Sequence, residues 1–378
     1  MKRILSALLV LALLPVPVIA APPEPDAKSA VLMDVTTGTV LYELNADEAL
    51  PPASVTKVMT MLLVMEAIDS GALSWEDTVT ASENAAAKGG SQVYLKAGET
   101  MTVSDMLKAV AVSSANDCAC ALAEHLAGSE EAFVDRMNRR AAELGMESTH
   151  FVNCTGLDDA PEAAEHRTSS MDIAIMSREL LLKHPDILRF TTIWMDTIRD
   201  GSFGLSNTNK LIRFYPGATG LKTGFTGGAL YCLSASARRE DLHLIAVVMG
   251  APTSQARFTA CRELLDYGFA GYSLYCPSLE DALGVPVKLA ATEAVALRLP
   301  PDSALLVEKG MASAVTTRLD LPEAVTAPVA EGQQLGSLLI YQGQTLVKTL
   351  PLTAAHPVPR LTWPQMFLRL LRQNAFGK

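Results

Sequence analysis

A serine and a lysine near the start of the chain are the first residues whose types and spacing suit catalysis. Ser54 and Lys57 precede an apolar run that predicts a buried helix ending near Gly71. Positions i and i+3 of a helix share one face, so we expect the hydroxyl and the amine to touch. A desolvated lysine can lose its proton and activate a serine nucleophile. Because this spacing is common, an N-cap serine followed by a surface lysine is the alternative for this pair alone.

Two further groups of polar residues strengthen the first prediction. Ser114 and Asn116 lie in a polar island between two apolar helical runs. Lys222, Thr223 and Gly224 lie in a glycine-rich stretch just before a strand pattern, so we expect an edge strand and turn there. The three groups in this order are a much stronger signal than any one of them.

In this order the three motifs resemble those of low-molecular-weight penicillin-binding proteins of the D-alanyl-D-alanine carboxypeptidase family, which are serine peptidases. The resemblance runs from about residue 30 to the C-terminus. It implies an enzyme that acts on the peptidoglycan stem peptide and removes the terminal D-alanine of the pentapeptide through an acyl-enzyme on Ser54. It also implies inhibition by β-lactam antibiotics and chemistry that needs no cofactor.

The resemblance also implies a catalytic role for each polar group. Ser54 attacks the carbonyl of the penultimate D-alanine, and Lys57 accepts its proton. Burial and the nearby charge of Lys222 are expected to lower the pKa of Lys57. Ser114 relays a proton to the leaving D-alanine, whereas Asn116 orients Lys57 and holds the substrate amide.

Substrate binding is expected from the third motif. Lys222 and Thr223 receive the terminal carboxylate, and Gly224 lets the substrate backbone approach the strand. The backbone N–H groups of Ser54 and Phe225 form the oxyanion hole.

Three further positions bear on the resemblance, one that matches the family and two that depart from it. Arg257 matches an arginine of the family that helps to hold the carboxylate, and the alternative is an arginine on the surface of a helix. Ala115 stands between Ser114 and Asn116, where relatives hold Asp or Gly, and both functional side chains are kept. Thr208 stands where some relatives hold arginine, which is expected to weaken one carboxylate contact.

The elements that must position these residues belong to an α/β fold. Strand patterns occupy residues 30–35 and 40–44, joined by a turn, and residues 230–237 and 242–249. Helical patterns occupy residues 106–110, 118–128, 130–144, 171–183 and 255–269. Strands at both ends with helices between them fit the β-lactamase/transpeptidase-like domain that the resemblance implies over residues 22–275, with a mixed-order antiparallel sheet.

The composition changes after this region. Residues 276–360 are rich in Val, Leu, Thr and Pro in short alternating runs, which predicts a small all-β domain with a hairpin over 338–348. A basic amphipathic helix is predicted over 361–378, as a membrane-surface anchor or, alternatively, a helix packed on its own domain. Its apolar and basic residues are Trp363, Met366, Phe367, Leu370, Leu371, Arg369, Arg372 and Lys378.

The N-terminus predicts export. Residues 1–21 have a basic start, an apolar stretch and a small residue suited to cleavage, which indicates a secretory signal peptide. A retained transmembrane anchor is the alternative. The expected location is therefore the cell envelope, at the outer face of the cytoplasmic membrane.

Composition excludes other classes of function. The net charge of −10 argues against nucleic-acid binding. The six cysteines show no CxxC spacing and the histidines no HExxH spacing, so no metal site is predicted. Six cysteines allow fifteen disulfide pairings, and the sequence chooses none of them. Cys118 and Cys120 lie in a helical pattern and are expected to be buried thiols.

Three other functions compete with the carboxypeptidase. A β-lactamase needs a general base for deacylation, and the region of Glu162 and Glu165 lacks the Glu-x-x-x-Asn pattern of class A enzymes. A DD-endopeptidase of the same family is hardly separated by sequence. A wall-binding protein with a decayed site is disfavoured because every named catalytic group is present.

Overall fold

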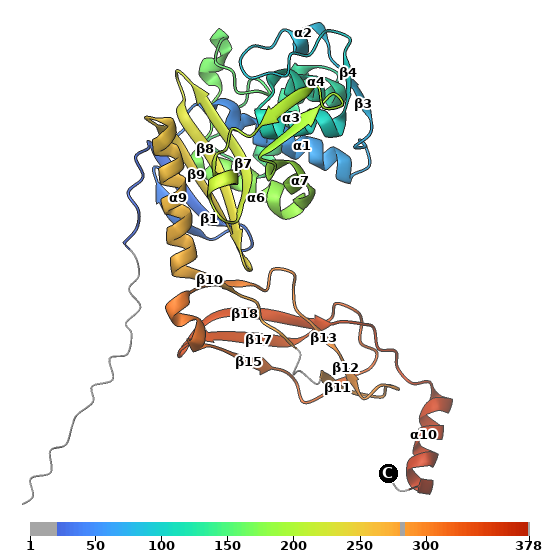
Figure 1. Ribbon diagram of the computed structural model, residues 1–378. Helices are drawn as coiled ribbons and strands as arrows, with labels where there is room; N and C mark the ends of the chain where they lie inside the picture. The colour runs from blue at the N-terminus through green and yellow to red at the C-terminus, as the bar shows by residue number, and fades with distance from the viewer. Residues whose placement is uncertain (1–20, 280–283, 377–378) are drawn as a thin grey trace, which may run out of the picture.

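The computed structural model describes residues 21–279 and 284–376. The predicted signal peptide therefore lies outside the described residues, except for Ala21. Figure 1 shows a large body of helices and sheet, a smaller body of strands, and a terminal helix beyond it.

A five-stranded sheet forms the centre of the large body, with the order β2-β1-β9-β8-β7 and antiparallel neighbours throughout. The N-terminal hairpin pairs with the last strand of the region, which confirms the predicted mixed order. The strands are β1 (Ser29–Asp34), β2 (Val40–Leu44), β7 (Ala218–Thr226), β8 (Leu230–Arg239) and β9 (Leu242–Ala251).

Both faces of this sheet are covered, so β9 is buried at every position. Alternate residues of a strand point to opposite faces. Accordingly Ile245 belongs to the larger core and Leu244 to the smaller one. Helix α9 (Ser254–Gly271) covers the smaller core, and α6 (Ser170–Lys183) covers the larger one (Figure 1).

Helix α1 (Lys57–Asp69) is the central helix of the larger core. Its apolar residues lie on nearly every side, so it is buried among its neighbours. These are α3 (Val103–Ser113), α4 (Asn116–Ala127), α5 (Glu130–Glu143) and α6. The shorter elements are β3 (Thr78–Thr80), α2 (Glu83–Ala86), β4 (Thr100–Thr102), η2 (Pro161–Glu165), η3 (Pro185–Ile187), α7 (Leu188–Thr191), β5 (Met195–Ile198), β6 (Phe203–Ser206) and α8 (Leu211–Phe214).

The start of the central helix differs from the prediction. Ser54 lies in a 3-10 turn, η1 (Ala53–Thr56), and the α-helix begins only at Lys57. Residues i and i+3 of a 3-10 turn are eclipsed, so this turn also brings the two side chains together.

The smaller body is the predicted all-β domain. Its sheets have the orders β13-β18-β17-β15, β12-β11-β16 and β10-β14. Strands β17 and β18 pair as the predicted hairpin. The elements are β10 (Tyr272–Tyr275), β11 (Val285–Lys288), β12 (Ala294–Val295), β13 (Leu297–Arg298), β14 (Leu305–Glu308), η4 (Lys309–Ala314), β15 (Val315–Asp320), β16 (Val325–Thr326), β17 (Gln334–Gln342) and β18 (Thr345–Ala354). Because β10 precedes residue 276 and pairs with β14, this body takes up chain before the predicted boundary.

The last helix, α10 (Trp363–Phe376), leaves an apolar face in solvent. Trp363 is 85% exposed and Phe367 is 61% exposed. A hydrogen bond of 2.6 Å from Arg369 Nη1 to the carbonyl of Ala290 ties the helix to the all-β domain. Among the described residues, no helix has the length and apolar character needed to cross a bilayer.

Candidate active site

The predicted pair of Ser54 and Lys57 is in contact. Lys57 Nζ lies 2.9 Å from Ser54 Oγ and donates a hydrogen bond of 2.7 Å to the carbonyl of Thr155. Lys57 is fully buried, whereas Ser54 is half-buried. The amine therefore has one polar neighbour that fixes its position and one that it can deprotonate.

Burial changes the protonation of this amine. It lowers the pKa of Lys57 to about 7, against the opposing effects of Cys154 and Asp117. Burial first and the charge of Lys57 second lower the pKa of Lys222. Because the repulsion between two like charges acts on both groups, it agrees with the expectation that Lys222 helps to lower the pKa of Lys57.

A turn that the sequence analysis missed positions Lys57. The side chain of Asn153 accepts hydrogen bonds from the backbone N–H groups of Thr155 and Gly156, at 3.1 and 2.7 Å. Gly156 has φ +82°, and a Cβ atom there would lie 1.8 Å from the carbonyl oxygen of Ala53. An asparagine three residues before a glycine is typical of such a turn and was the available signal.

Ser114 and Asn116 lie where helix α3 passes into α4. Ser114 ends α3 with φ +64°, a strained conformation for a residue with a side chain. Asn116 Nδ2 donates to the carbonyl of Gly89 at 2.7 Å, and its Oδ1 is buried without a partner. The backbone carbonyl of Thr155 accepts the hydrogen bond that positions the Lys57 amine, and the orienting role expected of Asn116 stays a prediction.

Asp117 lies in the first turn of α4 and accepts a hydrogen bond of 2.9 Å from the backbone N–H of Cys118. Its buried carboxylate accepts hydrogen bonds from the backbone N–H groups of Val93 and Leu95, and Asn116 N donates to the carbonyl of Ser91. The second motif is thereby fastened to the segment 89–95, which borders the site.

The third motif lies on β7, the edge strand of the sheet, as predicted. Lys222 is 1% exposed, and its Nζ donates to the carbonyl of Thr223 at 2.9 Å. Thr223 Oγ1 donates to Thr208 Oγ1 at 2.7 Å, and the backbone N–H of Thr208 donates to Val112 of α3. Thr208 therefore orients the hydroxyl of Thr223 and links β7 to the helix that carries Ser114.

Gly224 and Phe225 follow on the same strand. A Cβ atom at Gly224 would lie 2.6 Å from the carbonyl oxygen of Pro52, so this glycine lets β7 approach the turn that carries Ser54. Phe225 is 54% exposed and packs against Tyr231, with 4.4 Å between ring centroids.

Arg257 is not the surface arginine of the alternative prediction. It is 8% exposed, and its Nη1 donates to the carbonyls of Gly224 at 2.8 Å and Cys232 at 3.2 Å. Its Nε is buried without a partner. In this arrangement the guanidinium supports β7 from behind the third motif.

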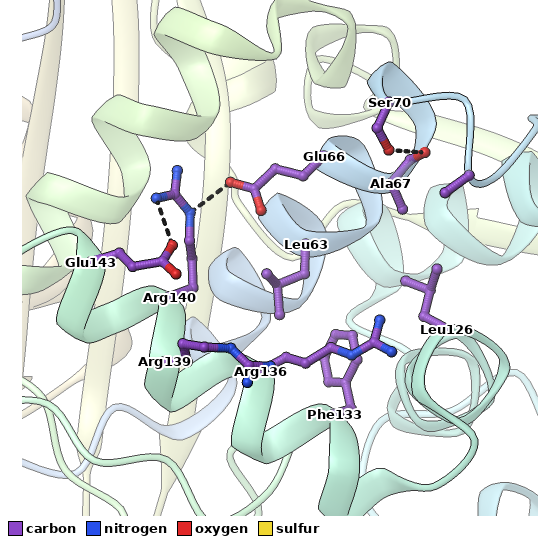
Figure 2. Close-up of a pocket in the computed structure, with 11 residues that line it drawn as sticks. Leu63, Glu66, Ala67, Ser70, Leu126, Phe133, Arg136, Arg139, Arg140 and Glu143 are labelled. Carbon is purple, nitrogen blue, oxygen red and sulfur yellow. Dashed lines mark hydrogen bonds and ion pairs between the residues drawn. The ribbon is translucent and has the colours of Figure 1, made fainter.

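A separate pocket lies between α1 and α5 (Figure 2), away from the three motifs. Its volume is about 440 Å³. Arg140 at its edge is held in ion pairs with Glu66 at 2.7 Å and Glu179 at 2.8 Å. No residue of the three motifs lines this pocket, so we do not assign catalysis to it.

Comparison with known proteins agrees with this geometry. Residues 17–253 match the model of a family described as D-alanyl-D-alanine carboxypeptidase. The chain belongs to this family. Residues 282–360 match the C-terminal domain of penicillin-binding protein 5. The resemblance that was based on the three motifs is therefore confirmed, as is the serine carboxypeptidase class of the enzyme.

Individual relatives align with most of this chain. The D-alanyl-D-alanine carboxypeptidase DacF from Bacillus subtilis is 43% identical over 336 residues, 87% of this chain and 85% of the relative. The crystal structure of penicillin-binding protein 5 from Haemophilus influenzae has a TM-score of 0.74 at 30% identity, covering 90% of this chain and 99% of the other. Penicillin-binding protein D2 from Listeria monocytogenes, in an ampicillin-bound form, has a TM-score of 0.59 at 34% identity, covering 65% of this chain and 98% of the other.

Proposed function

We propose that this carboxypeptidase is exported and removes the terminal D-alanine from peptidoglycan pentapeptide through an acyl-enzyme on Ser54. The observation that carries the proposal is the buried contact of 2.9 Å between Lys57 Nζ and Ser54 Oγ. With its pKa lowered to about 7, Lys57 is neutral in a large fraction of molecules at neutral pH. A neutral amine beside a hydroxyl is a ready general base.

The reaction follows from these positions. Lys57 takes the proton of Ser54 as the oxygen attacks the carbonyl carbon of the penultimate D-alanine. The backbone N–H groups of Ser54 and Phe225 stabilise the oxyanion, each contributing about 3 kcal/mol. The peptide C–N bond then breaks, Ser114 passes a proton to the leaving nitrogen, and D-alanine departs. Water hydrolyses the remaining ester and restores the serine hydroxyl.

Substrate recognition is assigned to the third motif. The terminal carboxylate binds near Lys222 and the Thr223 hydroxyl, with Arg257 behind the strand. An incoming anion raises the pKa of a buried amine, so the bound carboxylate would favour the charged form of Lys222. The unpartnered Oδ1 of Asn116 is free to accept the substrate amide N–H.

Replacing Ser54 with alanine is expected to lower D-alanine release from a diacyl-Lys-D-Ala-D-Ala substrate by about 10⁴-fold or more. Labelling by a fluorescent penicillin should vanish in the same variant, because the attacking oxygen is absent. Ser70→Ala, at an exposed helix end, is the control and should release D-alanine at the wild-type rate. Equal release from wild type and Ser54→Ala would refute the role of Ser54. A cross-linked peptide dimer in the same assay tests the DD-endopeptidase alternative.

A β-lactamase is less well supported than the peptidase. Glu162 and Glu165, the acidic residues considered as a deacylating base, are both exposed around η2. A general base must lie within hydrogen-bond reach of the water that it activates.

The terminal helix supports attachment to a membrane surface. The exposed Trp363 and Phe367 share the helix with Arg369, a combination that suits the boundary between headgroups and acyl chains. The alternative of a helix packed on its own domain is disfavoured by this exposure. The basic and apolar N-terminus supports export, which places the site beside the cell wall.

Removing residues 363–378 is expected to release the protein from membrane vesicles without loss of carboxypeptidase activity. The physical reason is that the exposed apolar face supplies most of the binding free energy. Phe367→Ser combined with Leu371→Ser should weaken binding in the same direction while keeping the basic charges. Sedimentation with anionic vesicles measures both, and membrane retention of the truncated protein would contradict the anchor.

A further inference from the structure

Two cysteines and a glutamate from three different segments meet in the interior next to the active site. Cys120 lies on α4, Glu130 at the start of α5 and Cys154 in the turn that precedes Thr155, and all three are buried. Their ligand atoms lie within 4.8 Å of one another. Cys154 Sγ is 3.2 Å from Glu130 Oε1, and Cys120 Sγ is 3.6 Å from Glu130 Oε2.

These donors and distances suit a thiophilic divalent cation. Zinc binds thiolate sulfur at about 2.3 Å and carboxylate oxygen at about 2.0–2.2 Å in a tetrahedron, which separates neighbouring ligand atoms by about 3.5–3.8 Å. One sulfur–oxygen distance, 3.6 Å, lies within this range and the other, 3.2 Å, is shorter, so side-chain shifts of a few tenths of an ångström would form the site. A fourth position remains for water, as in zinc sites with three protein ligands.

The site has an entrance and a balancing charge. A cavity of about 470 Å³ is lined by Glu130, Lys88 and Asn84. Lys88 Nζ lies 2.5 Å from Glu130 Oε2. Two thiolates and one carboxylate carry three negative charges, which a divalent ion and the Lys88 ammonium would neutralise. Buried charges are tolerated when they are paired in this way.

We propose that Cys120, Glu130 and Cys154 form a zinc site with three protein ligands that fastens α4 and α5 to the turn supporting Lys57. Each thiol gives up its proton to solvent as its sulfur–metal bond forms. Cys154 is next to Thr155, whose carbonyl accepts the hydrogen bond from Lys57. The metal would thus hold the residue that orients the catalytic amine, while touching no reacting atom. The free energy of metal binding would add to the stability of the folded protein.

The test uses the full-length chain without an affinity tag, reduced, freed of metal and then given Zn²⁺ or Cd²⁺. About one Zn²⁺ per chain should remain after desalting, and Cd²⁺ should give a thiolate charge-transfer band in the ultraviolet. Both signals should be lost in Cys120→Ser and in Cys154→Ser. Cys118→Ser is the matched control, since Cys118 is buried on the same helix but outside the cluster, and it should keep both signals.

Several outcomes would overturn the proposal. These are the absence of the charge-transfer band in the wild type, its survival in both Cys120→Ser and Cys154→Ser, or a Cys120–Cys154 disulfide in the unreduced protein by mass spectrometry. Penicillin labelling of each variant reports whether it has folded. If the serine variants fail to fold, X-ray absorption at the zinc edge of the wild type decides instead, because a site without two sulfur neighbours is not the one proposed.

Discussion

Replacing Lys57 with methionine is expected to slow acylation of Ser54 by penicillin and by peptide about 10³-fold, because general-base catalysis supplies about 10²–10⁴-fold. Methionine keeps the volume and apolar character of the lysine stem in a fully buried site, so loss of folding is not the expected cause. Stopped-flow acylation measures the rate. Lys183→Met, on the exposed end of α6, is the control and should acylate at the wild-type rate.

The same base sets the pH dependence of the wild type. Neutral Lys57 is the active form, so kcat/KM should rise tenfold per pH unit well below pH 7 and level off above the pKa of about 7. The residual rate of Lys57→Met should lack this limb. If kcat/KM of Lys57→Met still rose with pH around the same midpoint, the titration would belong to another group. That result would contradict the role of Lys57 as the base.

Gly156→Ala is expected to lower the free energy of unfolding of the peptidase domain by about 4 kcal/mol, which is at the upper end for single substitutions. The added Cβ would lie 1.8 Å from the carbonyl oxygen of Ala53, and the backbone at φ +82° disfavours a side chain. Relief of this clash must move either the turn that carries Thr155 or the 3-10 turn that carries Ala53 and Ser54, so acylation should slow as well. Urea unfolding followed by circular dichroism measures the stability.

Gly98→Ala separates the two causes. Gly98 has the same φ of +82°, but nothing lies within 4 Å of a Cβ atom there. Gly98→Ala should therefore lower the free energy of unfolding only through the strained backbone, by about 1–2 kcal/mol. Equal losses of stability in the two variants would show that the close approach to Ala53 has no energetic weight.

Local spacing explains what the sequence predicted well. Ser54 and Lys57 are three residues apart at a helix start, so their contact follows from helical geometry and survives even though the turn is 3-10. Alternation of apolar residues likewise predicted the hairpin of β17 and β18. The family followed from three motifs in order, and the comparisons confirm it.

Contacts between distant segments were beyond such reasoning. The carbonyl that orients Lys57 belongs to Thr155, 98 residues away, and a backbone oxygen leaves no signature in residue type. The substrate role of Arg257 stays a prediction, and its hydrogen bonds to two backbone carbonyls of the neighbouring strands could not be read from residue type.

The sequence by itself determined the chemistry of this protein, because a nucleophile and its base lie within one helical turn of each other. Only the tertiary structure decided how the base is oriented and how far burial lowers its pKa. It alone also brought Cys120, Glu130 and Cys154 together, where sequence spacing had indicated no metal site. The physical reason is that desolvation and convergence of ligands depend on how α4, α5 and the turn pack, and packing brings together residues that no local period relates.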